Sequence, residues 1–274
     1  MPRQLDAYAV GSLVALPLPA SDLCIDLTQT TFVTPAGMTV LFWIIRQLRE
    51  AGCRVHVEIG SKDVANYLCR MNFHLPFSGD VDLTFNPDIS AAKIHKADAS
   101  SSLMEFRLIA VNDSGDVESA ALHLLEIVAS QAPGLIRDRD EFFTSIAEMV
   151  SNVERHSGVK EASIVAQTVK DRVRVAVGDN GCGIRRSLAV LRANQIQHMP
   201  DHAVNLLATE PGVTGSPFGG GYGLTTLRDL VAARGQALHI ISGQGRATIL
   251  KSSSDGSPLQ FMTLGTVVEL SLQR

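Results

Sequence analysis

The sequence lacks the patterns of disulfide-rich and membrane-spanning proteins. Its four cysteines, Cys24, Cys53, Cys69 and Cys182, are scattered and form no C-x-x-C pair. This disfavours a disulfide framework or a zinc site and favours a reducing compartment. The longest apolar run, "TVLFWII" at residues 39–45, is far shorter than the roughly 18–20 residues of a membrane-spanning helix.

An excess of positive charge is also absent, because 24 Lys and Arg stand against 28 Asp and Glu, for a formal net charge of −4. Binding to nucleic-acid phosphates needs a basic surface, so we expect no nucleic-acid partner. The apolar stretch at 7–20 follows Arg3, but Asp6 interrupts its start and it continues into a strand pattern. We therefore expect no signal peptide and no membrane contact, and a cytoplasmic protein.

With 274 residues, 45% of them hydrophobic, the chain suffices for one large or two ordinary globular domains. Periodicity predicts a small α/β unit over residues 1–95 and a serine-rich linker at 95–103. The unit's expected elements are a strand at 23–28, a helix at 36–52, a strand at 53–59 and a helix at 62–73.

The second predicted unit spans residues 100–274 and contains several adjacent strands. Its expected elements are strands at 104–111, 162–169, 172–179, 237–242, 247–252 and 261–272, and helices at 117–132, 138–157 and from about Leu224 to Gly235. This succession predicts a mixed, largely antiparallel sheet with helices covering one face.

The predicted helix at 138–157 has an apolar stripe for packing against the sheet. On another face Glu148, Asn152 and His156 recur at intervals of four, so their side chains lie one turn apart. Such a row is often only a solvated surface, and His156 near a helix end also interacts favourably with the helix dipole.

The stretch "VGDNGCGI" at 177–184 ends a strand on Asp179. A carboxylate there is a suitable acceptor for an exocyclic amine such as that of adenine. Gly181 and Gly183 let the backbone approach a planar ligand. An ordinary glycine turn, with aspartate as a turn former, is the alternative.

A third stretch, "GSPFGGGYGLTTLRDL", places Gly219, Gly220, Gly221 and Gly223 before a helix. Free backbone N–H groups at a helix N-terminus form a phosphate cradle, although a surface loop also explains the glycines. The sequence has no G-x-x-x-x-G-K-[ST] motif, and Leu224 stands where the third glycine of G-x-G-x-x-G would fall. The common phosphate-binding motifs are therefore excluded.

Taken in order, E-x-x-x-N, D-x-G-x-G, the glycine cluster and "LGT" at 264–266 resemble the GHKL superfamily. It includes the ATP-binding domains of type II topoisomerases, heat-shock chaperones, mismatch-repair proteins and sensor histidine kinases, and the anti-sigma-factor kinases. The resemblance covers about residues 100–274. It implies the Bergerat fold, a two-layer α/β sandwich that binds ATP and Mg²⁺.

The resemblance also implies roles for individual residues. Asn152 matches the Mg²⁺ ligand, Glu148 the residue that orients the attacking water, and Asp179 the adenine-binding carboxylate. The remaining matches are a basic or histidine residue that many kinases of this type carry beyond the asparagine (His156), the first glycine box (Gly181, Gly183, Ile184), the second glycine box (Gly219, Gly220, Gly221, Tyr222, Gly223, Leu224) and the last-strand threonine (Thr266). Residues 185–218 match the lid over bound nucleotide, where Arg185 and Arg186 are candidates for phosphate contact.

The N-terminal unit resembles a STAS domain, the fold of anti-sigma-factor antagonists, over residues 24–57. Those antagonists have a phosphorylatable serine ahead of the first helix, where this chain reads Thr34-Pro35-Ala36-Gly37. The departure weakens the case for a phosphorylation switch, with Thr34 as a poorly placed acceptor. We expect the unit to dock a partner or to sense within the chain.

Together these features predict a cytoplasmic regulatory protein that binds ATP and Mg²⁺. It phosphorylates a protein partner, in the manner of the anti-sigma-factor Ser/Thr kinases, or binds the partner according to nucleotide state. The alternatives are an ATP-hydrolysing switch and a non-catalytic nucleotide-binding scaffold. A homodimer is compatible with the resemblance, whereas the partner, the phosphoacceptor and the signal are not identified by the sequence.

Overall fold

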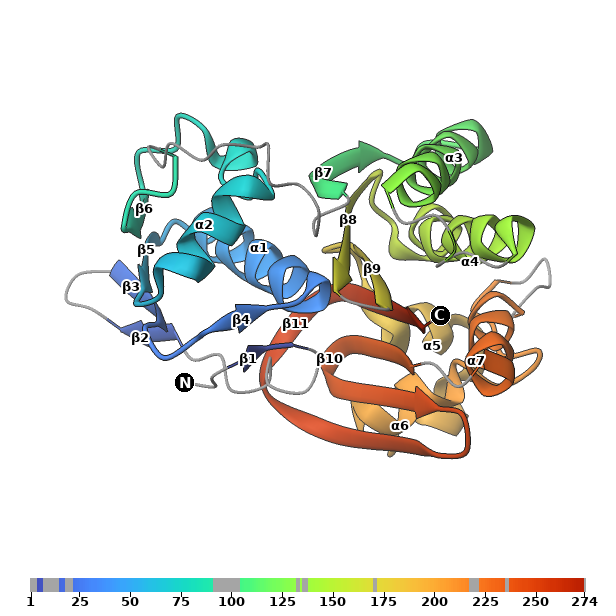
Figure 1. Cartoon of the computed structure of the whole chain (residues 1–274). Helices are drawn as coiled ribbons and strands as arrows, with labels where there is room; N and C mark the ends of the chain where they lie inside the picture. The colour runs from blue at the N-terminus through green and yellow to red at the C-terminus, as the bar shows by residue number, and fades with distance from the viewer. Residues whose placement is uncertain are drawn as a thin grey trace.

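A computed structural model describes residues 4–6, 15–17, 22–90, 104–131, 134, 138–169, 172–216, 222–234 and 237–273. In Figure 1 a smaller α/β part, blue to cyan, lies beside a larger one, green to red. No helix in these ranges is long and apolar enough to cross a membrane. The expected linker at 95–103 lies outside the described residues.

The N-terminal part contains a four-stranded sheet of order β2-β3-β5-β6. Strands β3, β5 and β6 are parallel, and β2 is antiparallel to β3. Its elements are β2 (Ala15–Pro17), β3 (Asp22–Leu27), α1 (Pro35–Glu50), β5 (Arg54–Ile59), α2 (Lys62–Arg70) and β6 (Leu83–Asn86), with a separate parallel pair of β1 (Gln4–Leu5) and β4 (Phe32–Val33). The predicted strand–helix–strand–helix order is confirmed, and the likeness to a STAS domain stays a prediction.

Helix α1 begins with a side-chain cap. The Thr34 hydroxyl accepts a hydrogen bond from the Gly37 N–H at 3.2 Å, and Pro35 occupies the first helical position, where its missing N–H costs nothing. Thr34 is fully buried. Its hydroxyl therefore serves the helix and is not accessible for phosphorylation in this conformation.

The C-terminal part is built on a five-stranded sheet of order β10-β11-β9-β8-β7. Its strands are β7 (Met104–Ala110), β8 (Glu161–Val169), β9 (Arg172–Gly178), β10 (Ala237–Leu250) and β11 (Ser254–Gln273). Every described pair in it is antiparallel, so the expectation of a mixed sheet is corrected here. The runs at 237–242 and 247–252 are one strand, because β10 continues through an irregular register at Gly243–Gly245.

One face of this sheet is covered by the predicted helices. They are α3 (Ser114–Gln131), α4 (Arg139–Asn152) and α7 (Gly223–Arg234), and they share a core with the sheet. Ile146 and Val150 of α4 pack in this core with Ile164 and Val175 of the sheet. The apolar stripe thus faces the strands, as its helical spacing predicts.

The opposite face of the sheet is covered too, by helix α1 of the N-terminal part (Figure 1). A second core joins the interior of that part to Val165, Ala176, Ile241 and Val267 of the sheet. The expectation of helices on one face, in two layers, is therefore incomplete. Strands that alternate apolar residues toward both faces need cover on both faces. The division into domains at 1–95 and 100–274 stays a prediction.

Gly178, at the end of β9, lies where α1 comes closest to the sheet. A Cβ atom added there would lie 2.4 Å from Cγ2 of Thr39 and 3.2 Å from Nε1 of Trp43, both on α1. Side chains do not tolerate contacts of 2.4 Å, so a residue with a side chain at this position would push the helix away.

We predict that Gly178→Ala lowers the free energy of unfolding by about 1–3 kcal/mol through overpacking. Thr39→Ser removes the obstructing methyl, so the double variant should recover part of the loss. Urea denaturation of the four proteins in this cycle measures both effects. A Gly178→Ala variant as stable as the parent would contradict the close packing of α1.

Candidate functional site

A cavity of about 320 Å³ lies among α4, α5 (Gly183–Ile196), α7, the end of β9 and the middle of β11. Its volume is within the range of small-molecule sites. The predicted site residues that line it are Glu148, Asn152, His156, Asp179, Gly183, Ile184, Tyr222, Gly223, Leu224 and Thr266. Gly181 is not part of the lining, although its N–H donates to the Asp179 carboxylate, and Gly219, Gly220 and Gly221 lie outside the described residues.

Asp179 is the buried carboxylate of the cavity, with 4% of its surface exposed. One carboxylate oxygen accepts a hydrogen bond from the Gly181 N–H at 2.7 Å, and the Asp179 N–H donates to the Thr266 carbonyl at 3.0 Å. Burial raises the pKa of Asp179 to about 7, although backbone hydrogen bonds from Gly181 and Thr266 to the carboxylate oppose the rise. An acid with this pKa at a cavity wall is suited to binding a ligand with hydrogen-bond donors.

Two glycines allow the chain to close around Asp179. Gly265 has a φ of 75°, and a Cβ added there would lie 2.6 Å from a carboxylate oxygen of Asp179. A Cβ on Gly181 would lie 2.2 Å from the Ser157 carbonyl oxygen, at the end of the helix region that carries Asn152. The glycine turn thus joins the strand ends to that helix, and an ordinary surface turn does not need such contacts.

The polar row of the helix faces the cavity rather than bulk solvent. Glu148 forms an ion pair with Arg155 at 3.2 Å, and the Asn152 amide nitrogen is buried with no hydrogen-bond partner among the described residues. Most buried polar groups have partners, so an unpartnered donor in a cavity wall indicates a place for a ligand acceptor.

The sequence predicts an α-helix that continues through His156, and the structure corrects this prediction. After Asn152 the helix widens into a π-helical turn, Val153–Ser157, and ends at Gly158 in the left-handed conformation. Single π turns are frequent at functional sites. Burial, with help from the neighbouring Arg155 charge, lowers the pKa of His156. The imidazole is therefore uncharged at neutral pH.

Helix α7 begins at the other end of the cavity. A Cβ on Gly223 would lie 2.5 Å from a carboxylate oxygen of Glu148 and 3.5 Å from the Asn152 amide nitrogen. The backbone at the start of α7 thus lies against the two polar side chains of α4. A helix N-terminus carries partial positive charge, so this corner of the cavity favours an anion.

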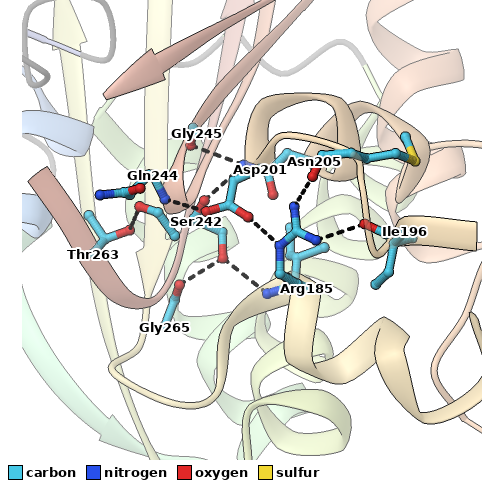
Figure 2. Close-up of polar contacts among 12 residues, drawn as sticks. Arg185, Ile196, Asp201, Asn205, Ser242, Gln244, Gly245, Thr263 and Gly265 are labelled. Atoms are coloured by element: carbon cyan, nitrogen blue, oxygen red, sulfur yellow. Dashed lines mark hydrogen bonds and ion pairs between the residues drawn. The ribbon is translucent and has the colours of Figure 1, made fainter. Parts of the chain in front are cut away.

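The helices between the two glycine boxes, α5 and α6 (Asp201–Leu207), are fixed to the β10 strand (Figure 2). The Asp201 carboxylate accepts hydrogen bonds from the Arg185 Nε at 2.5 Å and the Gln244 N–H at 2.7 Å. Arg185 also donates to the carbonyls of Ile196 and Met199. Arg185 is therefore structural here, and this arrangement corrects the expectation that it contacts phosphate.

A second group of hydrogen bonds connects this region to the part of the cavity around Asp179. The Ser242 hydroxyl accepts from the Ile184 N–H at 3.0 Å and donates to the Gly265 carbonyl at 2.8 Å. The Asn205 amide donates to the carbonyls of Ser242 and Gly245, at 3.1 and 3.0 Å. The base of the predicted lid is thus hydrogen-bonded to the strands beside Asp179.

Comparison with protein families matches residues 137–273 to the histidine kinase-, DNA gyrase B-, and HSP90-like ATPases. The match covers half of the chain and starts just before α4. The chain belongs to this family. Among curated proteins none matches the chain. The superfamily expected from the order of the motifs is thereby confirmed, whereas residues 1–136 lie outside the match.

The residues fit the metal and nucleotide that this family binds. The described ranges contain no cluster of three His, Cys, Asp or Glu side chains that could bind a metal ion by themselves. Mg²⁺ bound to a nucleotide needs few protein ligands, because phosphates and waters supply the others. The amide oxygen of Asn152 is a group of the kind that Mg²⁺ accepts, and the buried amide nitrogen, which has no partner among the described residues, would donate to a phosphate oxygen.

Sequence reasoning missed several residues of the cavity and its supports. Arg155 lies between two predicted positions of the helix, and no spacing rule distinguishes it. Val213, Thr214 and Gly215 line the cavity from the predicted lid, but the sequence identifies that segment only by its position between the glycine boxes. Ser242 ends a strand pattern, and its contact with Gly265 depends on the pairing of β10 with β11.

We predict that Asp201→Asn, which removes the charge joining Arg185 to β10, loosens α5 and α6 by about 1–3 kcal/mol. Amide hydrogen exchange should become faster in residues 183–207 and stay unchanged in β8 and β9. Asp229→Asn is the control, because in the described part of the chain the side chain of Asp229 forms an exposed ion pair with its neighbour Arg228. Equal exchange in the two variants would show that Asp201 does not fix the lid base.

Proposed function

We propose that the cavity binds ATP with Mg²⁺, adenine at Asp179 and phosphates beside Asn152 and the start of α7. One observation carries the proposal. A single cavity has a buried carboxylate at one end, and an unpartnered amide with a helix N-terminus at the other. These groups complement the exocyclic amine of adenine and the negative charge of a polyphosphate.

At the adenine end, the Asp179 carboxylate accepts a hydrogen bond from the amine, and Thr266 lies on the adjacent strand. The Thr266 hydroxyl is 3.2 Å from that of Ser242, so its orientation is set by the strand pair. Val177 and Val268 line the same wall. They supply apolar surface for a planar base, which the polar contacts then orient.

At the phosphate end, Asn152 ligates Mg²⁺, which offsets phosphate charge, and α7 presents backbone donors. The predicted second glycine box, residues 219–224, runs into the start of α7 at Gly223. Glu148 lines the cavity beside Asn152. We assign it to accepting the proton of the attacking hydroxyl, from a serine or threonine of a protein partner.

In this proposal the chain is a cytoplasmic protein kinase of the anti-sigma-factor type, or a nucleotide-dependent binder of the same partner. The N-terminal part, residues 1–95, is a STAS-like unit joined to the ATP-binding part, residues 100–274. The buried Thr34 argues against phosphorylation on that turn. A homodimer is compatible with this function.

Hydrolysis without a partner is the second candidate function. The same carboxylate of Glu148, at 30% side-chain exposure beside the cavity, would then orient a water molecule. Kinase and ATPase share the nucleotide site and differ in the oxygen that attacks the γ-phosphorus. The molecule that accepts the γ-phosphoryl group, a protein hydroxyl or water, therefore distinguishes the kinase from the ATPase.

We predict that the ratio of ATP affinity to GTP affinity depends on Asp179 and on pH. The adenine amine donates to the ionised carboxylate, so the ratio should rise with pH up to about 7 and level off above it. The terminal phosphates of both nucleotides also titrate near pH 7, but the effects of this titration on the two affinities cancel in the ratio. Asp179→Asn should reduce the ratio roughly 10- to 100-fold and make it independent of pH. Calorimetry with both proteins measures this, and an unchanged ratio would place adenine elsewhere.

Transfer of the γ-phosphoryl group should depend on Glu148. With γ-labelled ATP and Mg²⁺, label on protein supports the kinase, released phosphate the ATPase, and bound ATP that stays intact the scaffold. Glu148→Gln should slow transfer or hydrolysis by roughly 100-fold or more while nucleotide still binds. Glu154→Gln, on the same helix but outside the cavity lining, is the matched control. Equal rates in the two variants would remove Glu148 from the reaction.

A further inference from the structure

Trp43, the only tryptophan of the chain, connects the N-terminal part to the end of β9. It lies on α1 with 4% of its surface exposed. Its indole N–H donates to the Ser163 hydroxyl on β8 at 2.9 Å, and that hydroxyl donates to the Gly178 carbonyl at 3.1 Å. Because Ser163 both accepts and donates, its single hydroxyl proton is directed at Gly178.

The Gly178 carbonyl belongs to the same peptide group as the Asp179 N–H. That N–H donates to the Thr266 carbonyl on β11. Since a peptide group is planar, hydrogen bonds at both of its ends fix the plane from which the Asp179 side chain departs. The bond at the Asp179 end is a backbone bond of the sheet. At the Gly178 end, where β9 pairs with β8, the Ser163 side chain that Trp43 orients adds a further bond.

Helix α1 also contacts the strand that carries Thr266. The Glu269 carboxylate of β11, 2% exposed, accepts a hydrogen bond from the Ala36 N–H of the first turn of α1 at 2.8 Å. A carboxylate at a helix N-terminus interacts favourably with the helix dipole. Helix α1 is therefore bonded to β8 through Trp43 and to β11 through Glu269, on the side of the sheet opposite the cavity.

We propose that Trp43 and Ser163 are positioning residues for the nucleotide site. Through them the N-terminal part sets the orientation of Asp179, so that a shift of α1 weakens nucleotide binding. By linkage, nucleotide binding changes the surroundings of Trp43 to the same energetic extent. The inference rests on the proposed nucleotide site and adds a route by which the N-terminal part controls it.

The test combines calorimetry with the fluorescence of Trp43, excited at wavelengths where tyrosine does not absorb. In the parent protein, a non-hydrolysable ATP analogue with Mg²⁺ should change the emission with the Kd that calorimetry gives. Ser163→Ala removes the hydroxyl between Trp43 and Gly178. It should raise the Kd roughly tenfold and abolish most of the emission change.

Val57→Ala is the control for a general loss of stability. Val57 is buried in the same core as Trp43 but makes none of these hydrogen bonds. This variant should lower the melting temperature and keep the parent Kd and emission change. Trp43→Phe, which keeps an aromatic ring and loses the N–H donor, should also raise the Kd, and it tests the inference if Ser163→Ala does not fold.

Two negative outcomes are distinguishable. If the parent protein binds the analogue, but Trp43 emission stays constant and Ser163→Ala binds with the parent Kd, the positioning role is wrong and the nucleotide site stands. If calorimetry detects no binding to the parent protein, the proposed function fails and this inference fails with it.

Discussion

The peptide group between Gly178 and Asp179 is the point on which the structure depends. Three strands and one helix meet there: Ser163 of β8 and Thr266 of β11 bond its two ends, and α1 lies against Gly178. Two further glycines, Gly181 and Gly265, let the neighbouring chain close around the Asp179 side chain. As a result, the Asp179 carboxylate is held in one orientation in a cavity wall with little access to water. A hydrogen bond is stronger in such surroundings and therefore discriminates better between ligands.

The two faces of the ATP-binding sheet carry one buried acid each, and the two acids have different tasks. Burial raises the pKa of Asp179 and that of Glu269 to about 7. Glu269 is used by the fold, because it caps α1, whereas Asp179 retains a free direction toward the cavity. Because both pKa values exceed those of the unfolded chain, the folded state binds more protons, and stability falls as pH rises toward 7. Asp179 lowers the stability of the folded chain near neutral pH and lies beside a cavity. This combination favours a role in ligand binding over a purely structural role.

Local patterns made much of the site predictable. The four-residue spacing of Glu148, Asn152 and His156 and the strand ending on Asp179 are properties of single elements, and the structure brings these side chains to one cavity. Contacts between distant residues were not predictable in this way. Trp43 and Ser163 are 120 positions apart, and Ala36 and Glu269 are 233 apart, so no periodicity reveals that α1 covers the second face of the sheet. The prediction that Arg185 contacts phosphate was wrong for the same reason, because its hydrogen-bond acceptor Asp201 lies on another helix.

The most direct measurement is a crystal structure of the chain with a non-hydrolysable ATP analogue and Mg²⁺. We predict that the exocyclic amine of adenine lies within about 3 Å of an Asp179 carboxylate oxygen. We also predict that the metal binds the Asn152 amide oxygen and that α1 stays in its place behind β9. A nucleotide bound away from this cavity, or a base that leaves Asp179 without contact, would contradict these predictions.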